Sequence, residues 1–368
     1  MKKIAITMGD SGGIGPEIIL KALSFSYLRK ICIPVVIGDM LVIESAKKLL
    51  RLPARLKAIE SISEAKPAKD SIYIIHESNS IKNKIMNKPT FESGRACILF
   101  IQKAVALALK KEVDTIVTAP ISKESLKMAE SKWHGHTEML ANLSRTKDYA
   151  MMFAGGPLKI ILVTIHTALR NVPDLITRKK ILKTIYLAKR ACEMFSIKNP
   201  KIAVAGLNPH AGESGIFGDE EIRKITPAIK YAQKEGIDVK GPYPPDIIFH
   251  KAYKGEFDIV ICMYHDQGLI PLKMIAFDKG VNITVGLPFV RTSPDHGTAY
   301  DIAWKGIADP SSMVEAIKLA VKCLQKALEA RQLQPRIKIA VVPVKTKKLE
   351  MLTDDAVEGY LKELGLSK

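Results

Sequence analysis

The chain has 368 residues, of which 47% are hydrophobic and 6% are aromatic, and its formal net charge is +18. This length suffices for two domains with ordinary buried cores. The lysines are spread along the whole chain and aromatic residues are few, which argues against nucleic acid as a partner. There is no run of about 18 uncharged apolar residues and no signal-peptide core, and the five cysteines are widely spaced. We therefore expect a cytoplasmic protein with reduced core thiols and no membrane partner.

Strand-like and helical segments alternate along the chain. Strands rich in β-branched residues are predicted at residues 4–8, 35–37, 72–75 and 115–118. Helical spacing of apolar residues predicts helices at residues 95–111, 178–196, 219–234 and 311–331. This alternation is typical of an α/β fold with a mostly parallel sheet. A break at Pro335 is followed by a strand-like run at 337–342 and a short helical pattern at 354–364, so residues 336–368 read as an extension.

Three short apolar runs lead into a histidine. Residues 160–165 run into His166, residues 202–207 run through Asn-Pro into His210, and residues 259–263 run into His265. Ligands of open α/β sheets bind in the crevice outside the carboxyl ends of the strands, and neutral imidazoles are common ligands of divalent metals. Each histidine could instead cap its strand by bonding nearby backbone. Three equivalent positions favour a shared metal site.

The first predicted strand ends in a glycine-rich turn, Met-Gly-Asp-Ser-Gly-Gly-Ile-Gly-Pro-Glu at residues 8–17. Its glycines do not follow the Gly-x-Gly-x-x-Gly spacing of a Rossmann dinucleotide site. The turn resembles instead the Gly-Asp-Gly-Ile-Gly-Pro-Glu opening of the isocitrate and isopropylmalate dehydrogenase superfamily.

A second segment strengthens that resemblance. Residues 293–310 read Ser-Pro-Asp-His-Gly-Thr-Ala-Tyr-Asp-Ile-Ala-Trp-Lys-Gly-Ile-Ala-Asp-Pro, which is similar to the stretch that binds the adenosine half of NAD in those enzymes. The resemblance implies cofactor contacts by His296, Gly297, Asp301 and Ile302. It implies NAD rather than NADP, because the Asp301 carboxylate would repel a 2′-phosphate.

Five further motifs, at residues 118–123, 135–138, 208–213, 264–268 and 286–293, extend the similarity over residues 4–328. With them the chain resembles the 4-hydroxythreonine-4-phosphate dehydrogenase family of the vitamin B6 pathway. The resemblance implies NAD-dependent oxidation of 4-phosphohydroxy-L-threonine, with decarboxylation to 3-amino-2-oxopropyl phosphate. It also implies a homodimer whose active sites are shared between subunits.

The resemblance assigns residues to these roles. The metal ligands fall on His166, His210 and His265, with one divalent metal per site, zinc first and cobalt, manganese or magnesium as alternatives. The residues that bind the small phosphorylated substrate fall on His136, Thr137, Lys273, Asn282 and Arg291. Proton transfer is expected of Lys273, Asp246 and Asp266, although either aspartate could instead orient an imidazole.

The implied architecture is a two-domain isocitrate/isopropylmalate dehydrogenase-like fold with the active-site cleft between the domains. Residues 1–131 and 296–368 would form a discontinuous domain that contributes to NAD binding. Residues 132–295 would form a domain that carries the metal and substrate ligands and the dimer interface.

Three alternative functions stay open at this point. A paralogue would oxidise 4-phosphothreonate, 4-phosphoerythronate or a ring cis-diol, and Arg291, Lys273 and Asn282 suit any phosphorylated hydroxy acid. A phosphate acyltransferase-like enzyme would use no nicotinamide cofactor, and the segment 296–310 argues against it. A non-catalytic regulator would be expected to lack some of the site residues, all of which are present.

Overall fold

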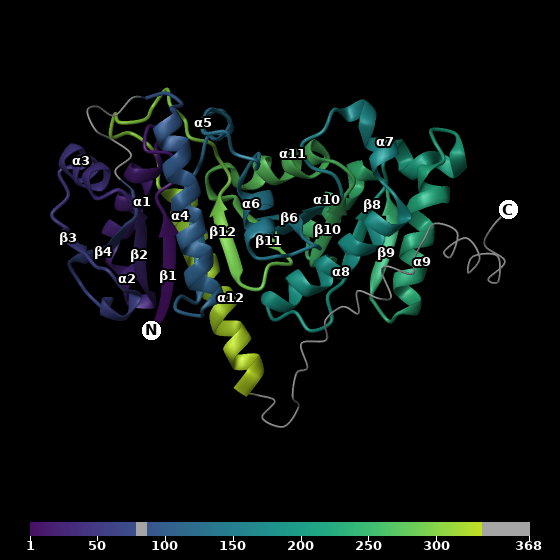
Figure 1. Ribbon diagram of the computed structural model, residues 1–368. Coiled ribbons are helices and arrows are strands. Elements are labelled where there is room, and N and C mark those ends of the chain that lie inside the picture. Colours follow the sequence, from purple (N-terminus) through teal and green to yellow (C-terminus); the bar gives the residue numbers. More distant parts are fainter. Residues whose placement is uncertain (79–86, 333–368) are drawn as a thin grey trace.

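The computed structural model describes residues 1–78 and 87–332, and within them twelve strands form one continuous sheet (Figure 1). The strand order is β3-β4-β2-β1-β5-β12-β11-β6-β7-β10-β8-β9. The strands are β1 (Lys2–Thr7), β2 (Cys32–Gly38), β3 (Arg55–Ala58), β4 (Ser71–His76), β5 (Thr115–Thr118), β6 (Ala150–Gly155), β7 (Leu158–Leu162), β8 (Ile202–Ala205), β9 (Val239–Tyr243), β10 (Ile259–Cys262), β11 (Val281–Val285) and β12 (Val290–Pro294).

Helices connect most of these strands. The α-helices are α1 (Gly15–Ser24), α2 (Ser26–Ile31), α3 (Met40–Leu50), α4 (Phe91–Leu109), α5 (Lys123–Met128), α6 (His136–Leu143), α7 (Val172–Leu175), α8 (Arg178–Met194), α9 (Thr226–Lys234), α10 (Pro245–Tyr253), α11 (His265–Ala276) and α12 (Ser311–Gln332). Short 3-10 or π-helical turns are η1 (Ile62–Glu64), η2 (Leu169–Asn171), η3 (Pro209–Gly215), η4 (Glu221–Ile225) and η5 (Phe277–Lys279).

The predicted α/β class with a mostly parallel sheet is confirmed. β11 is antiparallel to both β12 and β6, β6 is antiparallel to β7, and the other neighbouring strands run parallel. The predicted strand and helix after Pro335 lie outside the described residues. The division into two domains near residues 131 and 296 stays a prediction.

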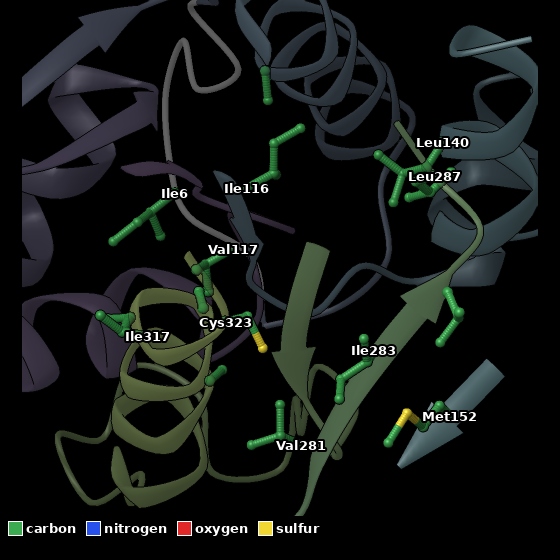
Figure 2. Close-up of a cluster of buried hydrophobic side chains, with 14 of the residues drawn as sticks. Ile6, Ile116, Val117, Leu140, Met152, Val281, Ile283, Leu287, Ile317 and Cys323 are labelled. Atoms are coloured by element: carbon green, nitrogen blue, oxygen red, sulfur yellow. The ribbon is translucent and has the colours of Figure 1, made fainter. Parts of the chain in front are cut away.

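One hydrophobic core spans the middle of the sheet. Figure 2 shows Ile6 of β1 and Ile116 and Val117 of β5 in the same cluster as Val281 of β11 and Ile317 of α12. All five side chains are at most 2% exposed. Burying each such side chain stabilises the fold by about 1.5–3 kcal/mol, so the core joins the N-terminal strands firmly to β11 and β12.

All five cysteines are buried thiols, as predicted. Within residues 1–78 and 87–332, none of the helices is both long enough and apolar enough to cross a bilayer.

The glycine-rich turn after β1 packs directly against the segment that begins at His296. The Ile14 N–H donates to the Thr298 carbonyl at 3.0 Å, and the Trp304 indole donates to the Ser11 carbonyl at 3.0 Å. A Cβ on Gly13 would lie 2.9 Å from the Thr298 side chain, so glycine is required there for this close approach. The two segments on which the superfamily resemblance rests are therefore in contact.

A buried carboxylate holds this arrangement together. Asp10 is fully buried and accepts hydrogen bonds from the hydroxyls of Ser125 at 2.7 Å, Tyr300 at 2.9 Å and Ser93 at 3.0 Å. It also accepts from the Gly12 N–H at 2.9 Å. Burial raises the pKa of Tyr300 to about 12, so this hydroxyl stays a donor at neutral pH. Donors from three separate segments thus meet at one side chain.

We expect Asp10→Ala to lower the free energy of unfolding by about 2–4 kcal/mol, because several buried donors lose their acceptor. Ser93→Ala, which removes one of these donors, should cost only about 1 kcal/mol. Urea unfolding followed by circular dichroism measures both. Equal stability of Asp10→Ala and the parent protein would show that this carboxylate does not hold the turn.

Candidate functional site

A cavity of about 650 Å³ lies beside the ends of β5, β11 and β12. All five predicted substrate residues line it: His136, Thr137, Lys273, Asn282 and Arg291. His166 and the predicted cofactor residues His296 and Gly297 line it as well. The structure therefore gathers side chains from α6, α11, β11 and β12, which are far apart in sequence, around a single space.

Arg291 is the most unusual residue of this cavity. It is 2% exposed, and its guanidinium donates to the hydroxyls of Thr118 at 2.6 Å and Thr284 at 3.1 Å. Its buried Nε has no hydrogen-bond partner, and none of the ion pairs among the described residues includes Arg291. Burial lowers its pKa to about 9, which leaves it cationic at neutral pH. A buried cation without a carboxylate partner suits an anionic ligand.

His136 and Asn282 also present buried polar atoms without partners. The Nε2 atom of His136 and the Oδ1 atom of Asn282 are both buried and without a hydrogen bond. Burial, assisted by the charge of Arg291, holds the pKa of His136 well below its usual value. His136 is therefore a neutral imidazole. Buried polar groups are normally hydrogen-bonded, so the two atoms indicate a polar ligand in the cavity.

Sequence reasoning missed three charged residues of the cavity wall, which are Asp295, Lys123 and Glu138. The Asp295 carboxylate lies 3.8 Å from the Lys273 ammonium; burial raises the pKa of Asp295, while Lys273 and the nearby imidazoles oppose that shift. Lys123, at the start of α5, adds a further positive charge. The signals were the position of Asp295 directly before His296, and the place of Lys123 at the end of the motif at residues 118–123.

The three strand-end histidines follow neighbouring parallel strands, as their common pattern predicts. β7, β10 and β8 are adjacent, and the rings of His166 and His265 lie 5.6 Å apart between centroids. His210 does not join this pair. Within the two described ranges, no group of three His, Cys, Asp or Glu side chains is arranged to hold a metal ion. The convergence of the three imidazoles on one metal ion therefore stays a prediction.

The separation of His210 has a local cause. Residues 210–214 all have positive φ, with values of 50° at His210 and 55° at Ala211. This left-handed turn redirects the chain after β8, and the His210 ring lies beside that of Phe217, with 6.2 Å between centroids. Left-handed backbone is uncommon for residues other than glycine, and it concentrates at functional sites.

Hydrogen bonds tie the histidine-bearing strand ends to one another. The Thr164 hydroxyl donates to the Met263 carbonyl at 2.7 Å, which joins the ends of β7 and β10. The buried Gln267 amide accepts from the Met263 N–H at 2.6 Å and donates to the Gly206 carbonyl at 2.7 Å, which joins β10 to β8. The spacing of the strand ends is thus fixed by buried side chains.

Besides His210 and His265, four predicted site residues lie outside the cavity wall. Asp266 bonds the Nδ1 atom of His265 at 2.7 Å, in agreement with an orienting role. Asp246 is exposed in the first turn of α10. Asp301 is exposed, and Ile302, which is partly buried, donates its N–H to the Ala299 carbonyl at 3.2 Å. The roles of all four stay predictions.

Acidification is expected to destabilise the protein through His136. Because its pKa is lowered in the folded state, the unfolded chain binds a proton below about pH 6.5 that the folded protein does not. The free energy of unfolding then falls as the pH falls, by up to about 1.4 kcal/mol per pH unit. Urea unfolding between pH 7.5 and 5.5 should show a flatter dependence for His136→Gln. The control His250→Gln, at an exposed position of α10, should keep the parental dependence of the unfolding free energy on pH. If His136→Gln also kept the parental dependence, the lowered pKa of His136 would not be its cause.

Comparison with known proteins places the chain in a family. Residues 30–320 match the family model described as pyridoxal phosphate biosynthetic protein PdxA. The chain is 47% identical over 319 residues to the 4-hydroxythreonine-4-phosphate dehydrogenase of Desulforapulum autotrophicum, covering 86% of this chain and 94% of that protein. It is 46% identical over 323 residues to the D-threonate 4-phosphate dehydrogenase of Salmonella typhimurium, covering 87% and 98%.

A solved structure agrees. The crystal structure of 4-hydroxythreonine-4-phosphate dehydrogenase from Klebsiella pneumoniae superposes with a TM-score of 0.81 at 43% identity, covering 88% of this chain and 98% of that one. Relatives that are dehydrogenases imply a nicotinamide cofactor. On this match in sequence and fold, the chain belongs to the PdxA family of pyridoxal phosphate biosynthetic proteins.

Proposed function

We propose that this protein is an NAD-dependent and divalent-metal-dependent 4-hydroxythreonine-4-phosphate dehydrogenase of pyridoxal 5′-phosphate biosynthesis. The main support for this proposal is the buried guanidinium of Arg291 on the wall of a polar cavity, which forms no ion pair with any residue that the structure describes. Such a site suits a phosphate or carboxylate group and would be costly to maintain without one.

The substrate would be held at both ends. Arg291, supported by the hydroxyls of Thr118 and Thr284, would bind one anionic group of the phosphorylated hydroxy acid. Lys273, whose side chain is 42% exposed, would meet the other anionic group. Neutral His136 and the Asn282 carbonyl would hydrogen-bond to hydroxyl and amino groups, which satisfies their unpartnered atoms.

The imidazoles present suit a divalent metal. Burial lowers the pKa of His166, so it is a neutral ligand at physiological pH, and the contact of Asp266 with Nδ1 of His265 leaves Nε2 of that ring available. We propose that His166 and His265 hold the ion and that the third ligand is His210 of the partner subunit. Zinc is the first choice, with cobalt, manganese or magnesium as alternatives. When bound, the metal would act as a Lewis acid toward the substrate hydroxyl oxygen.

The reaction needs one hydride transfer and two proton movements. The hydride would pass from carbon 3 to the nicotinamide, and the hydroxyl would lose its proton. Loss of carbon dioxide from the resulting 3-oxo acid would then leave a carbanion equivalent that must be protonated. Lys273 is the proposed proton donor because it lines the cavity beside the Asp295 carboxylate. Asp266 would orient His265, and Asp246 would be a further candidate for proton transfer.

The cofactor would lie along the segment that follows β12. His296 and Gly297 line the cavity, and Asp301 lies further along the same segment with an exposed carboxylate. That carboxylate would accept from the adenosine ribose hydroxyls, which supports NAD as the nicotinamide cofactor.

Exposed apolar residues support a homodimer with shared sites. Ile216 and Phe217, which follow the His210 turn, are 74% and 50% exposed, and Met274 and Phe277 near Lys273 are 84% and 74% exposed. Apolar side chains exposed in this number suit a protein interface. Such an interface would bring the His210 turn of one subunit close to the other subunit.

A second substrate fits the same site. The D-threonate 4-phosphate dehydrogenase of Salmonella typhimurium is 46% identical, which is hardly less than the 47% of the first relative. Arg291 and Lys273 would hold any phosphorylated hydroxy acid of this length. The alternative is therefore oxidation of 4-phosphothreonate by the same residues.

We expect reduction of NAD, measured at 340 nm, when metal-loaded protein receives 4-phosphohydroxy-L-threonine, and at least tenfold lower kcat/KM with 4-phosphothreonate. Removing metal with a chelator should abolish turnover, and adding Zn²⁺ or Co²⁺ should restore it. The reverse substrate preference would assign the second function. Absence of turnover with both substrates would overturn the proposal.

A further inference from the structure

The turn that carries His210 has a strained backbone, so contacts with the surrounding structure must stabilise it. Six consecutive residues, 210–215, have positive φ, and only Gly212 and Gly215 among them are glycines. Such a turn persists only where the surrounding structure determines it. The neighbouring polar contacts therefore decide where the His210 imidazole lies.

Glu221, in the turn η4, provides these contacts. It is 3% exposed, and its Oε1 accepts the backbone N–H groups of Leu207 at 2.7 Å and Asn208 at 2.8 Å. Its Oε2 accepts from the Asn208 side-chain amide at 2.9 Å. One buried carboxylate thus binds the two residues that link β8 to the His210 turn.

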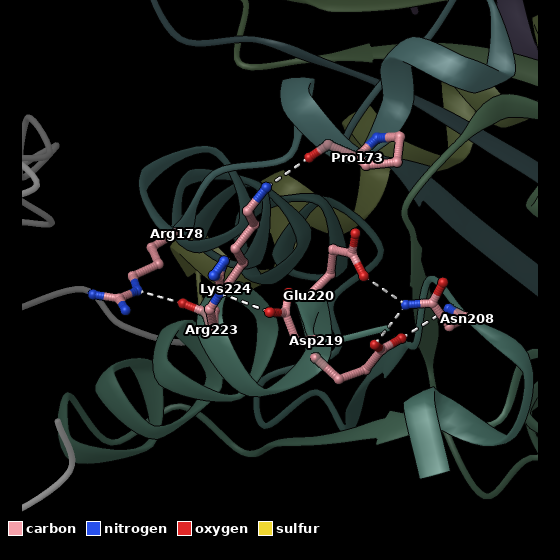
Figure 3. A network of polar contacts seen from close by, with 8 residues as sticks. Pro173, Arg178, Asn208, Asp219, Glu220, Arg223 and Lys224 are labelled. Carbon is pink, nitrogen blue, oxygen red and sulfur yellow. Dashed lines mark hydrogen bonds and ion pairs between the residues drawn. The ribbon is translucent and has the colours of Figure 1, made fainter. Parts of the chain in front are cut away.

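The same carboxylate also lies against the turn itself. A Cβ on Gly212 would lie 2.8 Å from Oε2 of Glu221, so this glycine allows the turn and the carboxylate to be in close contact. Glu220 accepts from the same Asn208 amide at 2.8 Å, a contact drawn in Figure 3, but it is only partly buried and makes no bond to the backbone before the turn. Glu221 therefore makes most of the contacts that hold the His210 turn in place.

We propose that Glu221 is a positioning residue that sets the His210 imidazole for metal binding. Glu221 touches neither substrate nor metal and acts through the backbone at residues 207 and 208. This inference rests on the proposed metal-binding role of His210. In Glu221→Gln the side chain keeps its shape, but one acceptor oxygen becomes an NH₂ group that must face a backbone N–H or the Asn208 amide.

The test is the affinity of the full-length, metal-free protein for Co²⁺, measured from the visible absorption of the bound ion. Glu221→Gln should raise the Co²⁺ Kd at least about tenfold, as expected when a residue that orients a ligand is changed. Glu220→Gln, the matched control, should change it less than about threefold, since it alters one partly exposed contact. Asn208→Ala keeps the two backbone bonds to Glu221 and should have an intermediate effect.

A double-mutant cycle separates this inference from the proposed function. If Glu221 acts through His210, adding Glu221→Gln to His210→Ala should not weaken Co²⁺ binding further. Parental affinity in Glu221→Gln, with weak binding in His210→Ala, would overturn the inference and leave the metal site standing. Parental affinity in His210→Ala would overturn the metal role of His210 and the inference with it.

If Glu221→Gln does not fold, Glu221→Asp takes its place, because the shorter side chain withdraws the carboxylate from the backbone N–H groups of Leu207 and Asn208. A Co²⁺ Kd in Glu221→Asp within twofold of the parental value would then overturn the inference. Hydrogen exchange at residues 208–216 provides a readout without metal: Glu221→Gln or Asn208→Ala should exchange faster there than the parent, and Glu220→Gln should not.

Discussion

The site depends above all on the burial of one positive charge. Placing a guanidinium inside a protein is unfavourable unless its donors are satisfied, and within residues 1–78 and 87–332 Arg291 meets two threonine hydroxyls and no carboxylate. The two threonines lie on the strands that flank Arg291, because Thr118 ends β5, Thr284 lies on β11, and β12 with Arg291 runs between them. The cavity is thereby electropositive on its inner wall, and the unpartnered atoms of His136 and Asn282 add polar groups that an oxygen-rich ligand would satisfy.

The sheet topology places the remaining groups. Parallel strands end at one edge, so the segments that carry the three histidines begin side by side after β7, β10 and β8, and buried side chains tie these strand ends together. On the other side of the cavity, the buried Asp10 carboxylate holds the glycine-rich turn near Tyr300 in the segment after His296. His166 and His296 thus line the same cavity from two separately stabilised parts of the fold.

Much of this could be predicted from the sequence. The strand at residues 115–118 is observed with the predicted bounds, because the local pattern of β-branched residues indicates a strand. The substrate residues predicted from family resemblance all line one cavity, because long motifs identify the family and its site residues. α11 was not predicted, since Gly268 and Pro271 interrupt its pattern. The left-handed turn at His210 was not predicted, because a run of left-handed residues has no simple sequence signature. The unpaired state of Arg291 depends on residues far away in sequence, so only the fold reveals it.

The most direct test of this account is the urea stability of Arg291→Met with and without 4-phosphohydroxy-L-threonine. Methionine removes the buried charge and retains much of the apolar bulk, so the variant should be at least as stable as the parent when no substrate is present. Saturating substrate should stabilise the parent by about 2–3 kcal/mol and leave Arg291→Met unchanged. If Arg291→Met were clearly less stable than the parent and still gained the full stabilisation from substrate, Arg291 would be a structural residue and the central claim would be wrong.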